Sequence, residues 1–365
     1  MPRLSSKGAS PSYSPRRRNQ IVLAVAALLI MLGLLVWSWQ DQQSPAPAKP
    51  SQSYSQTLEL ARNGRPGAAR VLYQQLTRTD LSDARRIALL AELPNYPSPQ
   101  ALKLLDIQLR HNSPAVREAA IQASGRLVAR DQLAKVLGPL LEDASQAVRF
   151  SAAMTLMTLS PDELGLYFAA QQHSVDALKA FLVTQPGTAQ NQLKLARCYE
   201  QSGDSGRALD ALQRAIAAEP DNLEAALARI ELLDRRGQGD QARELFARLL
   251  ERNPDSAPLQ HALGDWLLRH DQAEYALLSL AKAVELEPRN GGYRYDLAMA
   301  LHALDQFEPA QKQLAQILQD DPANRSARVL LIEYWKQAGQ LQNVQVLLAE
   351  LEQQNPDDPA LQQGL

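Results

Sequence analysis

The sequence predicts an all-α chain, built as a solenoid of stacked helix pairs and preceded by one transmembrane helix. Three observations support this fold class. An uncharged run of nineteen residues lies near the N-terminus, and an Ala-Arg or Val-Arg pair recurs every 32 residues in the segment that follows. Beyond it, prolines recur every 34 residues, a regularity typical of a repeat array; they are Pro186, Pro220, Pro254, Pro288, Pro322 and Pro356.

Composition agrees with stacked helices. Aromatic residues make up only 5% of the chain, and strand patterns are hard to find. Because Cys198 is the single cysteine, an intramolecular disulfide is impossible, and stability must come from helix packing.

The N-terminal residues predict a membrane anchor. Residues 1–20 are rich in Ser, Pro and Arg and are expected to form a disordered cytoplasmic tail. As a helix, Ile21 to Trp39 would span ~28 Å, enough to cross the hydrocarbon region of a bilayer. The basic cluster at 16–18 orients the helix with its N-terminus in the cytoplasm. The prediction is a single-pass inner (plasma) membrane protein with its bulk in the periplasm.

A cleaved signal peptide is the alternative. Ala46-Pro47-Ala48 offers the small residues of a cleavage site. The apolar run is longer than the core of a usual signal peptide, and polar residues separate it from that site. Retention as an anchor is therefore preferred, and both readings stay open. Residues 40–55 are predicted to be a linker that tethers the body near the membrane.

Residues 56–160 carry the 32-residue repeat. Its pairs are Ala84-Arg85, Val116-Arg117 and Val148-Arg149, each followed by Ala three positions after the Arg. An amphipathic segment precedes the second and third pairs, so a unit reads as helix, turn, helix. This pattern resembles the HEAT repeat family. The recurrent Arg is expected to bond turn carbonyls or an acid of a neighbouring unit. Residues 161–188 read as a degenerate repeat that joins this array to the next.

Residues 189–358 divide into five 34-residue units with the proline at position 32. Position 15 reads Gly203, Gly237, Asp271, Asp305 and Gly339. Position 20 reads Ala208, Ala242, Ala276, Ala310 and Val344, and position 24 reads Leu212, Phe246, Leu280, Leu314 and Leu348. A turn residue, a small residue where two helices cross and a bulky residue beside it are what a close helix pair requires.

These columns resemble the tetratricopeptide repeat (TPR) family, which has the same period and the same Ala, bulky and Pro positions. The sequence departs from that pattern at position 8, where Ile230 and Ile332 are large, and at position 4, where the frequent Trp is absent. Residues 359–365 remain as a C-terminal tail, too short for a capping helix. One hypothesis is therefore that a partner or a second copy covers the last repeat, as a homo-oligomer contact; the face concerned is Val344, Val346, Leu347 and Leu351.

Charge and motifs exclude several functions. The formal charge is −2, of which residues 1–20 contribute +5, so the body is mildly acidic and a nucleic-acid partner is not expected. Phosphate loops, a nucleophile elbow, HExxH and paired cysteines are missing from the sequence, so we expect no enzyme, no catalytic residues and no cofactor. His261 with Asp265 and His302 is the one grouping that suggests a metal, and a polar surface is the preferred interpretation.

The TPR resemblance implies that the first helix of each pair lines a concave, protein-binding groove. The positions that face a ligand in this family are Arg197, Glu200, Glu231, Asp234, Arg235, His261, Asp265, Arg269, Tyr295, Met299, His302, Glu333 and Lys336. The Lys or Arg at position 5 and Asn at position 9 by which some members clamp a terminal carboxylate are absent. The groove is instead a mixed-charge channel with an apolar patch at Tyr295 and Met299, suited to an extended or helical peptide.

The predicted function is a non-enzymatic, membrane-anchored scaffold that binds proteins. The order of HEAT and TPR repeats also looks similar to the non-haem C-terminal part of certain periplasmic multihaem cytochromes, which implies assembly of a respiratory or envelope complex. The haem-attachment sequence Cys-x-x-Cys-His is missing, so electron transfer does not follow. The alternatives are a metal- or haem-handling accessory factor and a regulatory subunit of an oxidoreductase.

Overall fold

A computed structural model of the chain describes residues 53–362. The predicted cytoplasmic tail and the predicted transmembrane helix lie outside the described residues. Within residues 53–362, none of the helices is both long enough and apolar enough to span a bilayer.

The first half of the described chain consists of helices of unequal length, from four residues in α9 to seventeen in α10. They are α2 (Tyr54–Arg62), α3 (Ala68–Leu76), α4 (Asp83–Glu92), α5 (Pro99–Leu109), α6 (Pro114–Leu127), α7 (Arg130–Leu137), α8 (Gln146–Leu156), α9 (Pro161–Leu164) and α10 (Phe168–Thr184). Single 3-10 turns follow three of them: η1 (Leu93–Asn95), η2 (Gly138–Glu142) and η3 (Gly165–Tyr167). Helices α4, α6, α8 and α10 pack in succession and share one apolar core with α2, α3, α5 and α7.

The recurrent arginines of this region hold the turns, as predicted. Arg117 Nη1 donates to the carbonyl oxygens of His111 (2.6 Å) and Asn112 (3.1 Å), and its Nη2 pairs with Asp143 of the next unit at 2.7 Å. Arg149 repeats the pattern one unit later, on the carbonyl oxygens of Asp143 and Ala144. Both parts of the prediction, turn carbonyls and a neighbouring acid, are confirmed at Arg117.

The first unit differs from the predicted register. Arg85 is exposed and lies over the ring of Tyr54, whereas the adjacent Arg86 is buried. Arg86 donates to the carbonyl oxygens of Leu76 (2.9 Å) and Arg78 (2.7 Å). The Ala84-Arg85 alignment therefore chose the wrong arginine, because two consecutive arginines fit the pattern and only burial separates them.

The second half of the described chain consists of regular helix pairs of nearly equal length. They are α11 (Ala189–Gln201) with α12 (Ser205–Ala218), α13 (Leu223–Arg235) with α14 (Gly239–Arg252), α15 (Ala257–Arg269) with α16 (Ala273–Leu286), α17 (Gly291–Ala303) with α18 (Phe307–Asp320), and α19 (Arg325–Gln337) with α20 (Leu341–Gln354). A final turn, α21 (Pro359–Gln362), follows.

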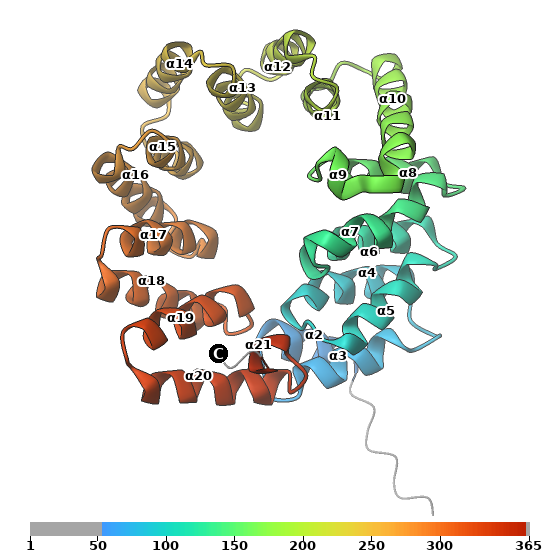
Figure 1. The fold of residues 1–365 in the computed structure, drawn as a ribbon, viewed down its shortest axis with the longest axis vertical. Helices are drawn as coiled ribbons and strands as arrows, with labels where there is room; N and C mark the ends of the chain where they lie inside the picture. The colour runs from blue at the N-terminus through green and yellow to red at the C-terminus, as the bar shows by residue number, and fades with distance from the viewer. Residues whose placement is uncertain (1–52, 363–365) are drawn as a thin grey trace, which may run out of the picture. The chain divides into compact units, whose positions relative to one another are not determined.

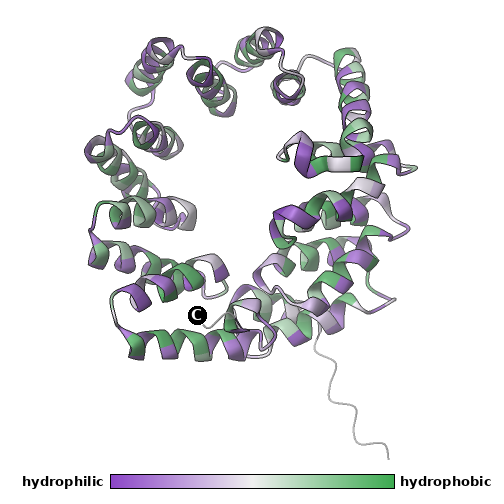
Figure 2. Ribbon diagram, viewed as in Figure 1, coloured by the Kyte–Doolittle hydropathy of each residue, from purple (hydrophilic) through white to green (hydrophobic). Residues whose placement is uncertain are grey.

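The residues that recur at positions 15, 20 and 32 of the repeat explain how these helix pairs form. Each position-15 residue has a positive φ, from 56° at Asp271 to 74° at Gly203, so the chain reverses through a left-handed residue that Gly adopts freely and Asp tolerates. Each repeat proline lies two residues after the last residue of its second helix, where it cannot continue the helix. The position-20 alanines are fully buried where the two helices of a pair cross. Each helix carries both hydrophobic and hydrophilic residues (Figure 2).

The helices follow one another until the last ones lie beside the first (Figure 1). Gln353 O accepts a hydrogen bond from Gly67 N at 2.7 Å, and Asn355 Nδ2 donates to Pro97 O at 2.7 Å. Gly64 packs so closely on Pro322 that a Cβ at Gly64 would lie 2.6 Å from the Pro322 oxygen. We call this junction, between residues 63–67 and 96–98 on one side and α18 to α21 on the other, the seam.

The seam corrects the expectation for the last repeat. Val344, Leu347 and Leu351 are buried within the chain, and Val346 alone of the four predicted residues is well exposed. Val344 and Leu347 belong to the core formed with α18 and α19, and Leu347 also faces the turn after α2. The hypothesis that a partner or second copy covers this face is therefore wrong for three of its four residues, because the chain buries them itself.

Candidate protein-interaction surface

The predicted groove residues all lie on the first helices of the TPR pairs. In Figure 1, α11, α13 and α15 lie on the inner side of the arc, and α12, α14 and α16 lie outside them. Several of the first helices begin at a capping side chain. The side-chain oxygens of Asn222 and Asn324 each accept a hydrogen bond, at 3.0 Å, from the backbone N–H three residues on. These caps fix where each helix starts, and so which side chains face inward.

Neighbouring repeats are joined by bonds between their inner helices. Arg235 Nη2 lies 2.7 Å from Glu200 Oε1, and His302 Nε2 lies 3.0 Å from Gln337 Oε1. Both bonds join position 12 of one repeat to position 13 of the next, 35 residues later. His270 Nε2 lies 3.0 Å from Asp234 Oδ1. Some side chains of the predicted groove therefore bond to the adjacent repeat.

One pocket lies where the two arrays meet. It has a volume of about 540 Å³ and is formed by α8, α11 and α13 with the residues that follow them. Three predicted groove residues line it: Arg197, Glu200 and Arg235. Met154 and Met157 provide an apolar wall from the HEAT side. The sequence prediction missed these two methionines, because the groove was assigned from the TPR positions alone.

A second pocket, of about 310 Å³, lies between α13 and α15. It brings together the predicted residues Glu231, His261, Asp265 and Arg269. Tyr293, which was not predicted, also lines it and stacks on the His261 ring with the centroids 4.7 Å apart.

The histidine of this pocket is held by acids. His261 Nε2 lies 2.7 Å from Asp296 Oδ2 and 3.9 Å from Asp265 Oδ2. The hydrogen bond with Asp296 is the main reason that the pKa of His261 is raised; burial opposes it, and the charges of Asp265 and Asp296 add to the increase. Burial raises the pKa of the Asp265 carboxyl. The pocket therefore carries charges of both signs, with Glu231, Asp265 and the neighbouring Asp296 beside His261 and Arg269. Asp296 was missed by the sequence prediction because it lies at position 6, outside the ligand-facing columns.

The structure does not place His302 beside His261 and Asp265, as the predicted metal grouping required. His302 bonds Gln337 and stacks on Tyr334 with ring centroids 3.7 Å apart. Over residues 53–362, no three His, Cys, Asp or Glu side chains are grouped so as to hold a metal ion. The grouping of His261, Asp265 and His302 that suggested a metal is therefore not formed in the described chain.

The remaining predicted residues continue along α17 and α19. Met299 is exposed, whereas Tyr295 is partly buried against the core of the last repeats, and burial raises the pKa of its hydroxyl. Glu333 accepts a hydrogen bond from Gln337 at 3.4 Å. Lys336 is exposed near the end of α19. The predicted apolar patch is thus mainly Met299.

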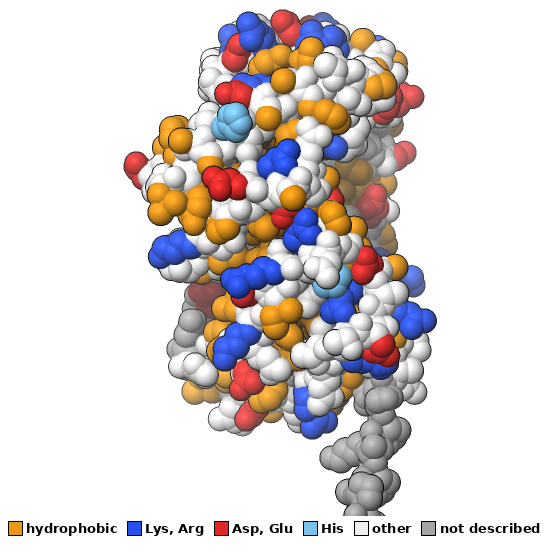
Figure 3. Space-filling model, turned by 90° about the vertical axis from the view of Figure 1, so that its right-hand side faces the viewer, with side chains coloured by type: hydrophobic (Ala, Val, Ile, Leu, Met, Phe, Trp, Pro, Cys, Tyr) orange, Lys and Arg blue, Asp and Glu red, His pale blue; other side chains and the backbone are white. Residues whose placement is uncertain are grey.

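The outer face of the HEAT side also carries charges of both signs. Figure 3 shows Lys and Arg side chains interspersed with Asp, Glu and hydrophobic side chains on that face. Charges of both signs lie close together there, so the face shown is mixed rather than uniformly basic.

Comparison with protein families agrees with the predicted HEAT and TPR repeats. Residues 69–157 and 101–188 match HEAT repeats, and residues 199–265 match the tetratricopeptide repeat. No curated protein matches the chain.

Several solved structures are similar to this chain. Yeast Tom70 is 14% identical with a TM-score of 0.49, and the match covers 84% of this chain and 62% of Tom70. MamA is 16% identical with a TM-score of 0.37, covering 46% of this chain and 91% of MamA. A thermophilic TPR protein of Thermus thermophilus is 22% identical with a TM-score of 0.36, covering 48% of this chain and 96% of its own. Together with the observed helix pairs, the two repeat matches identify the described chain as an α-solenoid of HEAT and TPR repeats.

Proposed function

We propose that this protein is a non-enzymatic scaffold that binds a segment of another protein on the inner face of its solenoid. The observation that carries the proposal is the pocket where the two arrays meet, in which Met154 and Met157 lie beside Arg197 and Arg235. Methionine and arginine are both enriched in protein interfaces, since one adapts its shape and the other makes several hydrogen bonds. HEAT and TPR repeat proteins typically act as such scaffolds.

The charges of the inner face favour a peptide with a defined direction. The pocket between the arrays is lined by three arginines, Arg197, Arg235 and Arg236, and by one acid, Glu200. The pocket on α13 and α15 holds Glu231 and Asp265, and Asp296 lies beside its histidine. A segment with acidic residues at the HEAT end and basic residues towards α15 would match both pockets.

Placement in the cell is also part of the proposal. The uncharged run from Ile21 to Trp39, after the basic cluster at 16–18, supports a single-pass anchor in the inner membrane with the solenoid in the periplasm. There the scaffold would serve assembly of a respiratory or envelope complex. Protease added to spheroplasts should digest the solenoid, and protection of residues 53–362 would contradict this placement.

Photo-crosslinking in membranes tests the binding surface. A photoreactive amino acid at Met157 of the full chain should capture a defined protein, identified by mass spectrometry. Arg235→Glu should abolish that capture, because it reverses the charge of a residue lining the pocket.

Arg248→Glu is the charge-reversal control. Because Arg235 also bonds Glu200 of the adjacent repeat, thermal denaturation of both variants checks that the repeats stay packed. Arg248 on the outer helix α14 also pairs with a glutamate four residues before it, as Arg235 does on α13. The control should leave capture unchanged. Equal capture by both variants would contradict the proposed surface, and substrate turnover by the purified chain would contradict the non-enzymatic assignment.

A further inference from the structure

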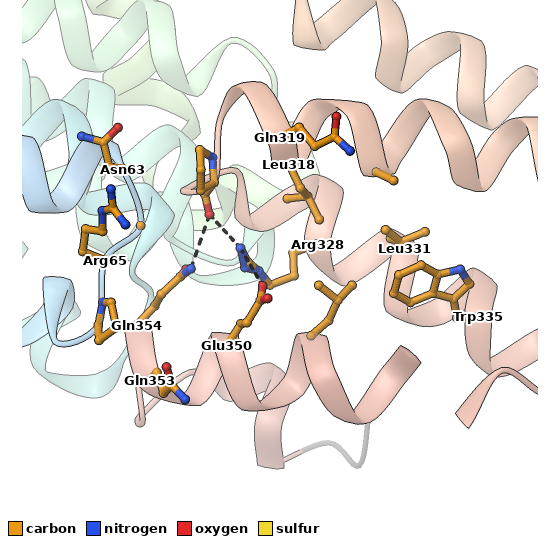
Figure 4. Close-up of a pocket in the computed structure, with 15 residues that line it drawn as sticks. Asn63, Arg65, Leu318, Gln319, Arg328, Leu331, Trp335, Glu350, Gln353 and Gln354 are labelled. Carbon is orange, nitrogen blue, oxygen red and sulfur yellow. Dashed lines mark hydrogen bonds and ion pairs between the residues drawn. The ribbon is translucent and has the colours of Figure 1, made fainter. Parts of the chain in front are cut away.

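The seam contains a pocket that no sequence pattern indicated. We call it the seam pocket; its volume is about 520 Å³, and residues 63–66, α18, α19 and α20 line it. Figure 4 shows Asn63 and Arg65 on one side, Arg328 and Glu350 in the middle, and Trp335 on the far side. This volume lies within the range of small-molecule sites, about 300–1,000 Å³.

Arg328 is buried in this pocket without a full set of partners. Its side chain is 2% exposed, and Nη2 donates to Pro322 O at 2.7 Å. Nε and Nη1 are buried and have no hydrogen-bond partner. A buried donor without an acceptor is destabilising, more so in a charged group. The site therefore has unused capacity to bind an acceptor.

The acid beside Arg328 is loosely held. Glu350 Oε2 lies 3.7 Å from Arg328 Nη2, beyond hydrogen-bond distance, and its side chain is 49% exposed. Arg65, exposed on the turn after α2, adds a second positive charge at the mouth of the pocket. Glu350 can move into solvent at little cost, so another carboxylate can take its place beside Arg328.

The rest of the wall is apolar. Leu318, Leu331 and Trp335 line the side away from Arg65. The amide side chains of Gln319, Gln353 and Gln354 complete the rim. The seam pocket thus places a cationic end next to an apolar end.

We propose that the seam pocket is a binding site for a carboxylate carried on a short apolar group. The carboxylate displaces Glu350, bonds the guanidinium of Arg328 and is further attracted by Arg65. The apolar group lies against Leu318, Leu331 and Trp335. Because one side of the pocket is the turn after α2 and the other is formed by α18, α19 and α20, such a ligand also stabilises the closed seam.

Calorimetric titration of the full chain tests this site with two probes. One is 4-methylpentanoate, a free short-chain acid, and the other is N-acetyl-leucine, which resembles the end of a peptide. Either carboxylate should bind, and its uncharged amide should bind at least about tenfold more weakly, because a charge-assisted hydrogen bond is lost. Tighter binding of N-acetyl-leucine favours the end of a peptide as the ligand, and tighter binding of 4-methylpentanoate favours a free acid.

Two substitutions should act in opposite directions. Arg328→Met should weaken binding about tenfold or more, whereas Glu350→Gln should strengthen it several-fold by removing the competing carboxylate. If Arg328→Met does not fold, as checked by circular dichroism, Glu350→Gln and the exposed Arg65→Gln still decide the question. Failure of both carboxylates to bind at millimolar concentration, or equal binding of acid and amide, would overturn the proposal. Partner capture at Met157 is measured independently.

Discussion

Asn355 donates its side-chain N–H to the carbonyl oxygen of Pro97 at 2.7 Å, across 258 residues of sequence. The bond joins the residue after α20 to the loop before α5, and Asn355 is 1% exposed. Tyr73 and Tyr96 lie nearby; Tyr96 donates to Ala61 O at 2.5 Å, and burial raises the pKa of Tyr73 to about 12. Polar bonds thus join the two ends of the solenoid, whereas apolar cores join the repeats.

Asn355→Ala should loosen the seam. The substitution removes the bond and leaves Pro97 O without its donor, at a cost of about 1–3 kcal/mol in the free energy of unfolding. Urea denaturation and small-angle X-ray scattering measure the loss and any increase in the radius of gyration. Asn343→Ala is the control, because Asn343 is exposed on α20, the helix that Asn355 follows, and its side chain bonds Gln340, three residues before it. If the two variants behave alike, the Asn355 bond does not hold the seam.

Gly64→Ala should destabilise the chain more than Gly203→Ala. Both glycines have a positive φ, 54° and 74°, so each alanine costs about 1 kcal/mol or more in backbone strain. At Gly64 the new Cβ would also lie 2.6 Å from Pro322 O, whereas nothing lies within 4 Å at Gly203. The extra loss for Gly64→Ala, about 1–3 kcal/mol, measures how tightly the seam is packed. Equal losses in thermal denaturation would argue against a closed seam.

Arg117→Met should be strongly destabilising. Arg117 and Asp143 are only 13% and 10% exposed, and removing one partner leaves a largely buried carboxylate and two turn carbonyls without a donor. Breaking a buried pair costs about 3 kcal/mol or more. Arg110→Met, which removes an exposed pair with Asp106, should cost less than about 0.5 kcal/mol. Chemical denaturation of the two variants compares them directly, and a loss at Arg117 as small as that at Arg110 would contradict a structural role.

The pair of His261 and Asp296 should make stability depend on pH. The folded-state pKa of His261 is raised, so the folded state binds the proton more tightly than the unfolded state. This contribution is complete below the unfolded pKa, about 6.5, and is lost as pH rises through the higher folded value. The free energy of unfolding should therefore fall as the pH rises from 6 to 8.

Asp296→Asn should flatten that dependence, because the main cause of the raised pKa is removed. Denaturation at the two pH values, with nuclear magnetic resonance titration of the His261 ring, provides the measurement. A ring pKa that stays the same in Asp296→Asn would show that the hydrogen bond is not the cause.

The repeat architecture could be predicted from the sequence because each recurring position meets a local structural requirement. A left-handed turn accepts Gly or Asp, a helix crossing needs Ala, and a proline ends a helix. The bonds of Arg117 to turn carbonyl oxygens and to a neighbouring acid were predicted in the same way, because the arginine recurs beside the turn of each unit. The choice between Arg85 and Arg86 could not be made, because adjacent positions differ only in what covers them.

The candidate surface was only partly predictable. Family positions placed Arg197 and Arg235 on the inner face, where they line the pocket between the arrays. They could not indicate Met154 and Met157, which come from the other array, or Asp296, which reaches His261 from the next repeat.

The amino-acid sequence by itself determined that residues 56–160 and 189–358 stack as helix pairs, because contacts within and between adjacent repeats are short in sequence and recur with a fixed period. Only the tertiary structure decided that the two ends meet. Small rotations between successive repeats add up along the array, and no single residue specifies their sum. The seam, its pocket and the burial of Arg328 follow from that accumulated curvature.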